Sequence, residues 1–112
     1  MFRMADIRAA SLAAHAAARK AKGRPAAGFA ARAAGHAVGT AHVPQHAFGG
    51  AIYALKAMVA ANPTDGGAVV GRERTWQARH LTPRLRAEFL KRVTIQKERC
   101  GVVVRLVKDN DF

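Results

Sequence analysis

Apolar residues recur at helical spacing along most of this chain, and they predict five helices. The clearest stripe is Phe48, Ile52, Leu55 and Val59, which fall on one face of a helix that turns every ~3.6 residues. Alanine, the strongest helix former, fills most positions between the larger side chains. The expected helices cover residues 5–22, 25 to about 41, a segment that follows Pro44, about 69–80, and 83 to about 93.

Prolines and glycines mark where these helices should begin and end. Pro25 and Pro83 suit the first helical turn, where the missing N–H would be unbonded in any case. Pro44 excludes the helical conformation for the preceding residue and should separate two close-packed helices. The run Asn-Pro-Thr-Asp-Gly-Gly over residues 62–67 predicts a turn.

Four glycines lie inside helical patterns, where each costs about 1 kcal/mol relative to alanine. They are Gly35, Gly39, Gly49 and Gly50. A core built from alanine and few larger residues requires helix backbones in close approach. We therefore expect these glycines to lie where helices touch.

The length of 112 residues and the alanine-rich pattern predict a single all-α domain of packed helical hairpins. The composition changes near the C-terminus, where residues 101–107 (GVVVRLV) form the only strongly strand-forming run. We expect a helical domain over residues 1–94 and a C-terminal arm over residues 95–112. That arm should be disordered or paired as a strand, with little part in the core.

A formal net charge of +12 favours polyanions or an acidic protein surface as partners. The longest apolar run, residues 47–61, contains Lys56 and is shorter than a membrane-spanning helix. The single cysteine, Cys100, excludes an intrachain disulfide and suits a reducing compartment. These features predict a soluble, cytoplasmic protein.

The first 35 residues are rich in Arg and Ala and contain one acid, Asp6, a composition that organelle transit peptides share. The same alanine-rich pattern continues past any plausible cleavage point. A first folded helix is therefore the preferred interpretation.

Three histidines surround the predicted break at Pro44: His36, His42 and His46. His42 and His46 are four residues apart, a spacing that can place two imidazoles on one helix face for a metal. No Cys, Asp or Glu between residues 33 and 58 completes a ligand set. We favour packing histidines that hydrogen-bond backbone groups beside the break, and we expect no metal and no cofactor. A catalytic use with Tyr53 as general acid would need a nucleophile or an orienting carboxylate, and the segment supplies neither.

A second cluster is basic and surrounds Trp76. Its members are Arg72, Arg74, Arg79, Arg84, Arg86, Lys91 and Arg92. A cationic face with one exposed aromatic side chain could follow a nucleic-acid backbone. A lone helical tryptophan is also a common core anchor, and arginines on helix faces are often simply solvated.

The run AARAAGHAVGTAHVPQHAFGGAIYALKA (residues 30–57), followed by ERTWQARHLTPRLR (residues 73–86), resembles the bacterial putative immunity protein family of short alanine-rich helical proteins. The segment RAASLAAHAAAR (residues 8–19) is similar to that family's preceding helix. The ordered residues that carry the resemblance are His36, His42, His46, Tyr53, Lys56, Trp76 and Gln77. The resemblance implies a small non-enzymatic protein that binds and neutralises a cognate toxin.

We therefore expect a protein-binding, immunity-type function, with a basic nucleic-acid-binding protein as the second hypothesis and a histidine-based metal protein or enzyme as the third. The expected binding residues are His36, His42, His46, Tyr53, Lys56, Arg72, Arg74, Trp76, Gln77 and Arg79. Non-specific polyanion binding should accompany the charge. The stripe around Ile52 needs cover from both sides, which also predicts a homo-oligomer.

Overall fold

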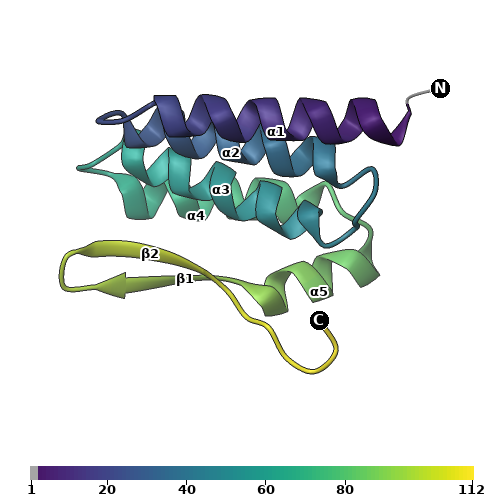
Figure 1. Ribbon diagram of the computed structural model, residues 1–112. Coiled ribbons are helices and arrows are strands. Elements are labelled where there is room, and N and C mark those ends of the chain that lie inside the picture. The colour runs from purple at the N-terminus through teal and green to yellow at the C-terminus, as the bar shows by residue number, and fades with distance from the viewer. Residues whose placement is uncertain (1–2) are drawn as a thin grey trace.

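The computed structural model describes residues 3–112 and contains five helices followed by a β-hairpin (Figure 1). The helices are α1 (Met4–Lys20), α2 (Pro25–Gly39), α3 (His46–Ala61), α4 (Gly66–Arg79) and α5 (Pro83–Arg92). The strands are β1 (Val93–Glu98) and β2 (Gly101–Leu106). The predicted all-α class is confirmed, and the strand-like alternative for the C-terminal segment is the observed one.

Local residue chemistry accounts for most helix boundaries. Pro25 and Pro83 each occupy the first turn of a helix, as predicted. Gly23 lies in the α1–α2 connection with a φ of +77°, a conformation that few other residues adopt. Three boundaries differ from prediction by two or three residues. Helix α1 ends at Lys20, and α2 ends at Gly39, so that the chain turns before Pro44. Helix α4 begins at Gly66, inside the predicted turn.

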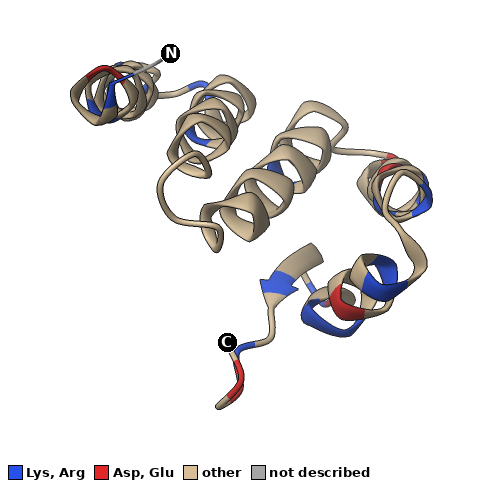
Figure 2. Ribbon diagram, turned by 90° about the vertical axis from the view of Figure 1, so that its right-hand side faces the viewer, with Lys and Arg blue, Asp and Glu red and all other residues tan. Residues whose placement is uncertain are grey.

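Helices α1 to α4 form a curved row in which each packs against the next along the chain (Figure 2). Helix α2 lies between α1 and α3, and α3 lies between α2 and α4. The hairpin packs under α3 and α4, so α3 is covered on several sides.

The core lies where α3, α4, α5 and the hairpin meet. Its fully buried side chains are Leu55, Val70 and Val93, joined in one cluster by Ile52, Ala78, Phe89 and Val104. The predicted stripe on α3 is confirmed as core, with Ile52 and Leu55 buried and Phe48 and Val59 packed against them. Cover for this stripe comes from the same chain.

The C-terminal segment contributes more than predicted. Strands β1 and β2 pair antiparallel, with Ile95 opposite Val104, and Val104 is buried in the core cluster. The expectation of an arm with little part in the core is therefore wrong. The strand β1 was missed because its residues, VTIQKE, show only weak alternation.

Arg92 fixes the last residues of the chain to α5. Its side chain is only 2% exposed, contacts Glu88, and donates hydrogen bonds to the Val107 carbonyl (3.2 Å) and to Asp109 (3.0 Å). Hydrogen bonds from Lys91 and Arg92 lower the pKa of Asp109 to about 2, so this carboxylate stays ionised near neutral pH. A buried guanidinium is tolerated here because its donors are satisfied.

Within residues 3–112, no helix is both long enough and apolar enough to cross a membrane.

The glycines of the first three helices give a direct test of close approach. A Cβ at Gly49 would lie 2.5 Å from Nδ1 of His36, whereas a Cβ at Gly71, in the middle of α4, would meet nothing within 4 Å. We expect Gly49→Ala to destabilise the protein by about 1–3 kcal/mol through overpacking, despite alanine's better helix propensity.

The matched control is Gly71→Ala, which should leave stability unchanged or raise it by up to about 1 kcal/mol. Urea denaturation of both variants measures the difference. Equal stability of the two variants would show that the glycine at position 49 is not required for helix contact.

Candidate functional site

The structure divides the predicted binding residues into two groups on different parts of the molecule. The first group is a row of histidines between α1, α2 and α3. His36 on α2 is central, with ring centroids 5.1 Å from His15 on α1 and 5.1 Å from His46 on α3. His42, in the turn before α3, follows at 5.5 Å from His46. The row thus connects three helices.

Each of three imidazoles packs over a glycine of a neighbouring helix. A Cβ at Gly35 would lie 2.8 Å from Nε2 of His15, and a Cβ at Gly39 would lie 3.1 Å from Cδ2 of His46. His36 takes the corresponding place over Gly49. The rings therefore fill the space that the glycines leave, which confirms the predicted role of Gly35, Gly39 and Gly49.

Hydrogen bonds show that these rings belong to the packing. Nδ1 of His36 and Nδ1 of His46 lie 2.9 Å apart, so the N–H of one ring donates a hydrogen bond to the bare nitrogen of the other. Arg32 lies 3.4 Å from Nδ1 of His15. Burial, followed by the charges of neighbouring basic groups, lowers the pKa of both His15 and His36.

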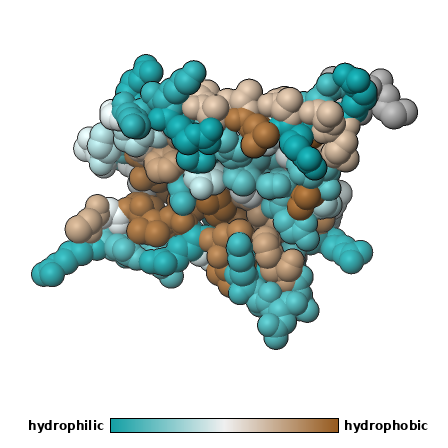
Figure 3. Space-filling view, in the orientation of Figure 1, coloured by the Kyte–Doolittle hydropathy of each residue, from teal (hydrophilic) through white to brown (hydrophobic). Residues whose placement is uncertain are grey.

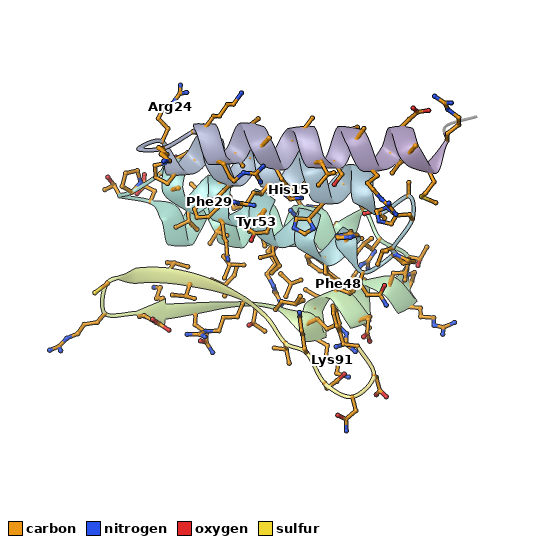
Figure 4. The ribbon with its side chains drawn as sticks, in the orientation of Figure 1. His15, Arg24, Phe29, Phe48, Tyr53 and Lys91 are labelled. Carbon is orange, nitrogen blue, oxygen red and sulfur yellow. The ribbon has the colours of Figure 1, made fainter. Side chains whose placement is uncertain are left out.

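Tyr53 and Lys56 extend this group along α3. Tyr53 stacks on His36 with centroids 5.3 Å apart, and Phe29 of α2 stacks on Tyr53 at 6.1 Å (Figure 4). The Lys56 ammonium lies 5.1 Å from the centroid of the Tyr53 ring, a cation–π contact. Five aromatic or imidazole side chains thus line the α1–α2–α3 contact.

His42 departs from its predicted role. It lies beside the break at Pro44, but its Nδ1 is buried with no hydrogen-bond partner among residues 3–112. The predicted hydrogen bonds to backbone groups beside the break are therefore not the ones observed, since His36 and His46 bond each other and this atom of His42 has no partner. Across the described part of the chain, no set of three or more His, Cys, Asp or Glu side chains is arranged to hold a metal ion.

The second group lies on α4, where Trp76 is 56% exposed and packs against His80 with ring centroids 4.1 Å apart. Trp76 is thus a surface side chain, and the alternative of a core anchor is wrong. Arg72 and Arg79 are exposed and, with Trp76, line a shallow hollow on the outer face of α4.

Two other predicted residues of α4, Arg74 and Gln77, form hydrogen bonds within the fold. Arg74 donates hydrogen bonds to the carbonyls of Val93 (2.7 Å) and Leu90 (3.0 Å) and so satisfies the end of α5. Gln77 donates to Glu73 (3.4 Å), and its Oε1 is buried without a partner within residues 3–112.

The prediction that seven basic residues surround Trp76 needs correction. Arg86 donates to the carbonyls of Ala78 and Leu81, both at 3.0 Å, and thereby satisfies the end of α4. Arg92 is buried, and Arg74 is bound to α5. The arginines that line a hollow together with Trp76 are Arg72 and Arg79.

An apolar hollow of about 480 Å³ lies on the other side of Trp76, between α3, α4 and α5. Its walls include Phe48, Leu81, Leu85 and Phe89. Leu85 lies one turn before Phe89 on α5 but is 55% exposed, whereas Phe89 is buried. The spacing of these two residues in the sequence indicates one apolar helix face, but periodicity does not show which apolar side chain remains uncovered.

A smaller hollow of about 280 Å³ lies between α3 and β2, lined by Phe29, Val59 and Val102 among others. Figure 3 shows apolar side chains between the helical layer and the hairpin on an otherwise largely hydrophilic face. This hollow contains none of the predicted residues except Lys56.

The comparisons with known proteins gave one match. The family model of the Imm-5 like putative immunity protein matches residues 1–84 of the chain. No curated protein and no solved structure matches it. The matched residues include both the histidine row and Trp76.

The histidine row should make the protein less stable in acid. The pKa values of His15 and His36 are lowered in the folded protein, so these two rings take up protons at a lower pH there than in an unfolded chain, where imidazole protonates near pH 6.5. The free energy of unfolding should therefore decrease as the pH falls from about 7.5 through 6.5, until the folded rings also protonate. Urea midpoints at several pH values measure the effect. Asp109, with its pKa of about 2, stays ionised in this range.

The variants His15→Gln and His36→Gln should flatten this pH dependence. A urea midpoint that stays constant or rises between pH 7.5 and 5.5 in the unsubstituted protein would contradict the argument.

Proposed function

Because the chain belongs to the Imm-5 like putative immunity protein family, we propose that it is a non-catalytic protein that binds and neutralises a protein toxin of its own host. The observation that supports a binding role is the exposed Trp76 on α4, beside Arg72 and Arg79. Tryptophan and arginine are the side chains that most often dominate the energy of protein interfaces.

The histidine row supports a binding function over a catalytic one, because its rings are engaged in contacts between helices. The rings of His15, His36 and His46 are packed over glycines, and His36 and His46 hydrogen-bond each other. Their chemistry is thus used in holding α1, α2 and α3 together. We propose that His36, His42, His46, Tyr53 and Lys56 support the fold, and that Trp76, Arg72 and Arg79 contact the partner.

We also propose a cytoplasmic location, where a reducing environment suits the exposed free thiol of Cys100.

A deletion strain tests the function directly. Cells that lack this chain should be inhibited when grown in contact with their otherwise identical parent, because the parent still delivers the toxin. Expression of the chain from a plasmid should restore survival. Survival of the deletion strain without the plasmid, under conditions in which the parent inhibits unrelated sensitive cells, would contradict the proposal.

The variant Trp76→Ala should reduce protection, with a loss of affinity for the toxin of about 30-fold or more, the usual cost of truncating a central interface tryptophan. The matched control is Leu12→Ala, which removes another exposed apolar side chain, 61% exposed on α1. Equal protection by the two variants, at equal thermal stability, would exclude Trp76 from the binding surface.

A charge of +12 favours polyanion binding as a second, non-specific property (Figure 2). Retention on double-stranded DNA should fall steeply between about 50 and 200 mM salt and should not depend on the sequence. The double variants Arg72→Glu/Arg79→Glu and Arg8→Glu/Lys22→Glu change the charge equally and should weaken retention to a similar extent. Tight binding to one DNA sequence at high salt would instead support the nucleic-acid hypothesis.

A further inference from the structure

Trp76 separates two hollows of different chemistry. On one side is the apolar hollow between α3, α4 and α5, of about 480 Å³. On the other is the basic hollow on the outer face of α4, of about 470 Å³, lined by Arg72, Thr75 and Arg79. The tryptophan side chain lines both. A partner that covers Trp76 therefore meets an apolar and a cationic surface at once.

The apolar hollow has the properties of a pocket for one large apolar side chain. Leu85 and Trp76 on its rim are 55% and 56% exposed, so they expose apolar surface that a partner could remove from water. The polar side chains of the lining are few, namely Gln77, His80 and Glu88. Glu88 contacts the buried Arg92.

The basic hollow has the properties of a carboxylate site. Arg72 and Arg79 form no ion pair within residues 3–112, where the acidic partners of the ion pairs are Asp6, Glu88, Glu98 and Asp109. A guanidinium binds a carboxylate through two parallel hydrogen bonds. Gly67 and Gly71 also line this hollow, and a Cβ at Gly71 would meet nothing within 4 Å. A partner's backbone can therefore approach α4 closely.

We propose that Trp76 and its two hollows bind an acidic segment of a protein partner. A large apolar side chain of that segment enters the hollow beside Leu85, and carboxylates on the other side of Trp76 pair with Arg72 and Arg79. This inference rests on the proposed function, since it names the chemistry by which the toxin is recognised.

Charge selects this occupant over two others. A second copy of the chain carries the same +12 and only seven Asp and Glu residues, so like charges oppose its approach. A nucleic acid would place phosphates near the basic hollow, but the mostly apolar hollow beside it offers few groups for the polar edges of a base.

The test uses the full chain and a displayed library of short random peptides as the probe. Selected peptides should share one Leu, Phe or Met anchor with several Asp or Glu residues nearby. Trp76 is the only tryptophan of the chain. In a complex with a synthetic peptide that contains no tryptophan, the tryptophan emission therefore reports on this site alone. The emission should shift to the blue on titration, and replacing the anchor by Ala should weaken binding at least tenfold.

Protein variants locate the peptide. Arg72→Glu/Arg79→Glu should weaken binding at least tenfold more than the matched control Arg8→Glu/Lys22→Glu, and Leu85→Ala should weaken it more than Leu12→Ala. All four positions of the charge variants are exposed, as are both leucines. Circular dichroism verifies that the variants are folded.

Three results would overturn the inference. The first is the selection of peptides without acidic residues, and the second is an equal loss of binding for the two members of each variant pair. The third is a change of Trp76 emission that comes from self-association, or from an oligonucleotide that displaces the peptide. The deletion-strain assay is independent of these measurements. If Arg72→Glu/Arg79→Glu still protects the cells, this site is refuted while the immunity function stays intact. If the deletion strain survives contact with its parent without the plasmid, the function itself is refuted.

Discussion

The close contact of α1, α2 and α3 depends on imidazole rings that occupy the space above glycines. Three helical glycines each face one ring, and a methyl group at two of those positions would lie within 3 Å of it. The backbones also approach directly, since a Cβ at Gly50 would lie 3.7 Å from backbone atoms of α2. Histidine suits this place because its ring is flat and can hydrogen-bond a second ring across the contact. The stack of Tyr53 and Phe29 is held by the same approach.

The α4–α5 half of the molecule is held by arginines that satisfy helix ends. The last carbonyls of a helix have no partner within it, and Arg86 supplies donors for α4 while Arg74 supplies them for α5. Each of these arginines lies on the other helix of the pair, so the two helices are joined reciprocally. Arg72 and Arg79 are left to the surface, where they line one hollow beside Trp76. The basic composition thus serves both the fold and the exposed face.

The β-hairpin completes the cover of α3. Val104 belongs to the core cluster, and Val102 and Leu106 pack against it. This cover weakens the argument for a homo-oligomer, which rested on an uncovered stripe around Ile52. Among the large apolar side chains that stay exposed, Trp76 and Leu85 lie beside one apolar hollow, where α4 and α5 face solvent.

The sequence by itself determined the five helices, the proline positions at their first turns, the glycine contacts and the family. The helices and the prolines depend on residues within one or two turns of each other, the glycine contacts follow from a core built mostly from alanine, and the family rests on an ordered motif. The tertiary structure alone decided which ring meets which glycine, that Arg74, Arg86 and Arg92 bind the fold while Arg72 and Arg79 do not, and that Leu85 stays exposed beside Phe89. Those outcomes join residues up to 20 positions apart, as His15 and Gly35 are. Local periodicity carries no information on such pairs, because it gives the face of a helix and not the neighbour that covers it.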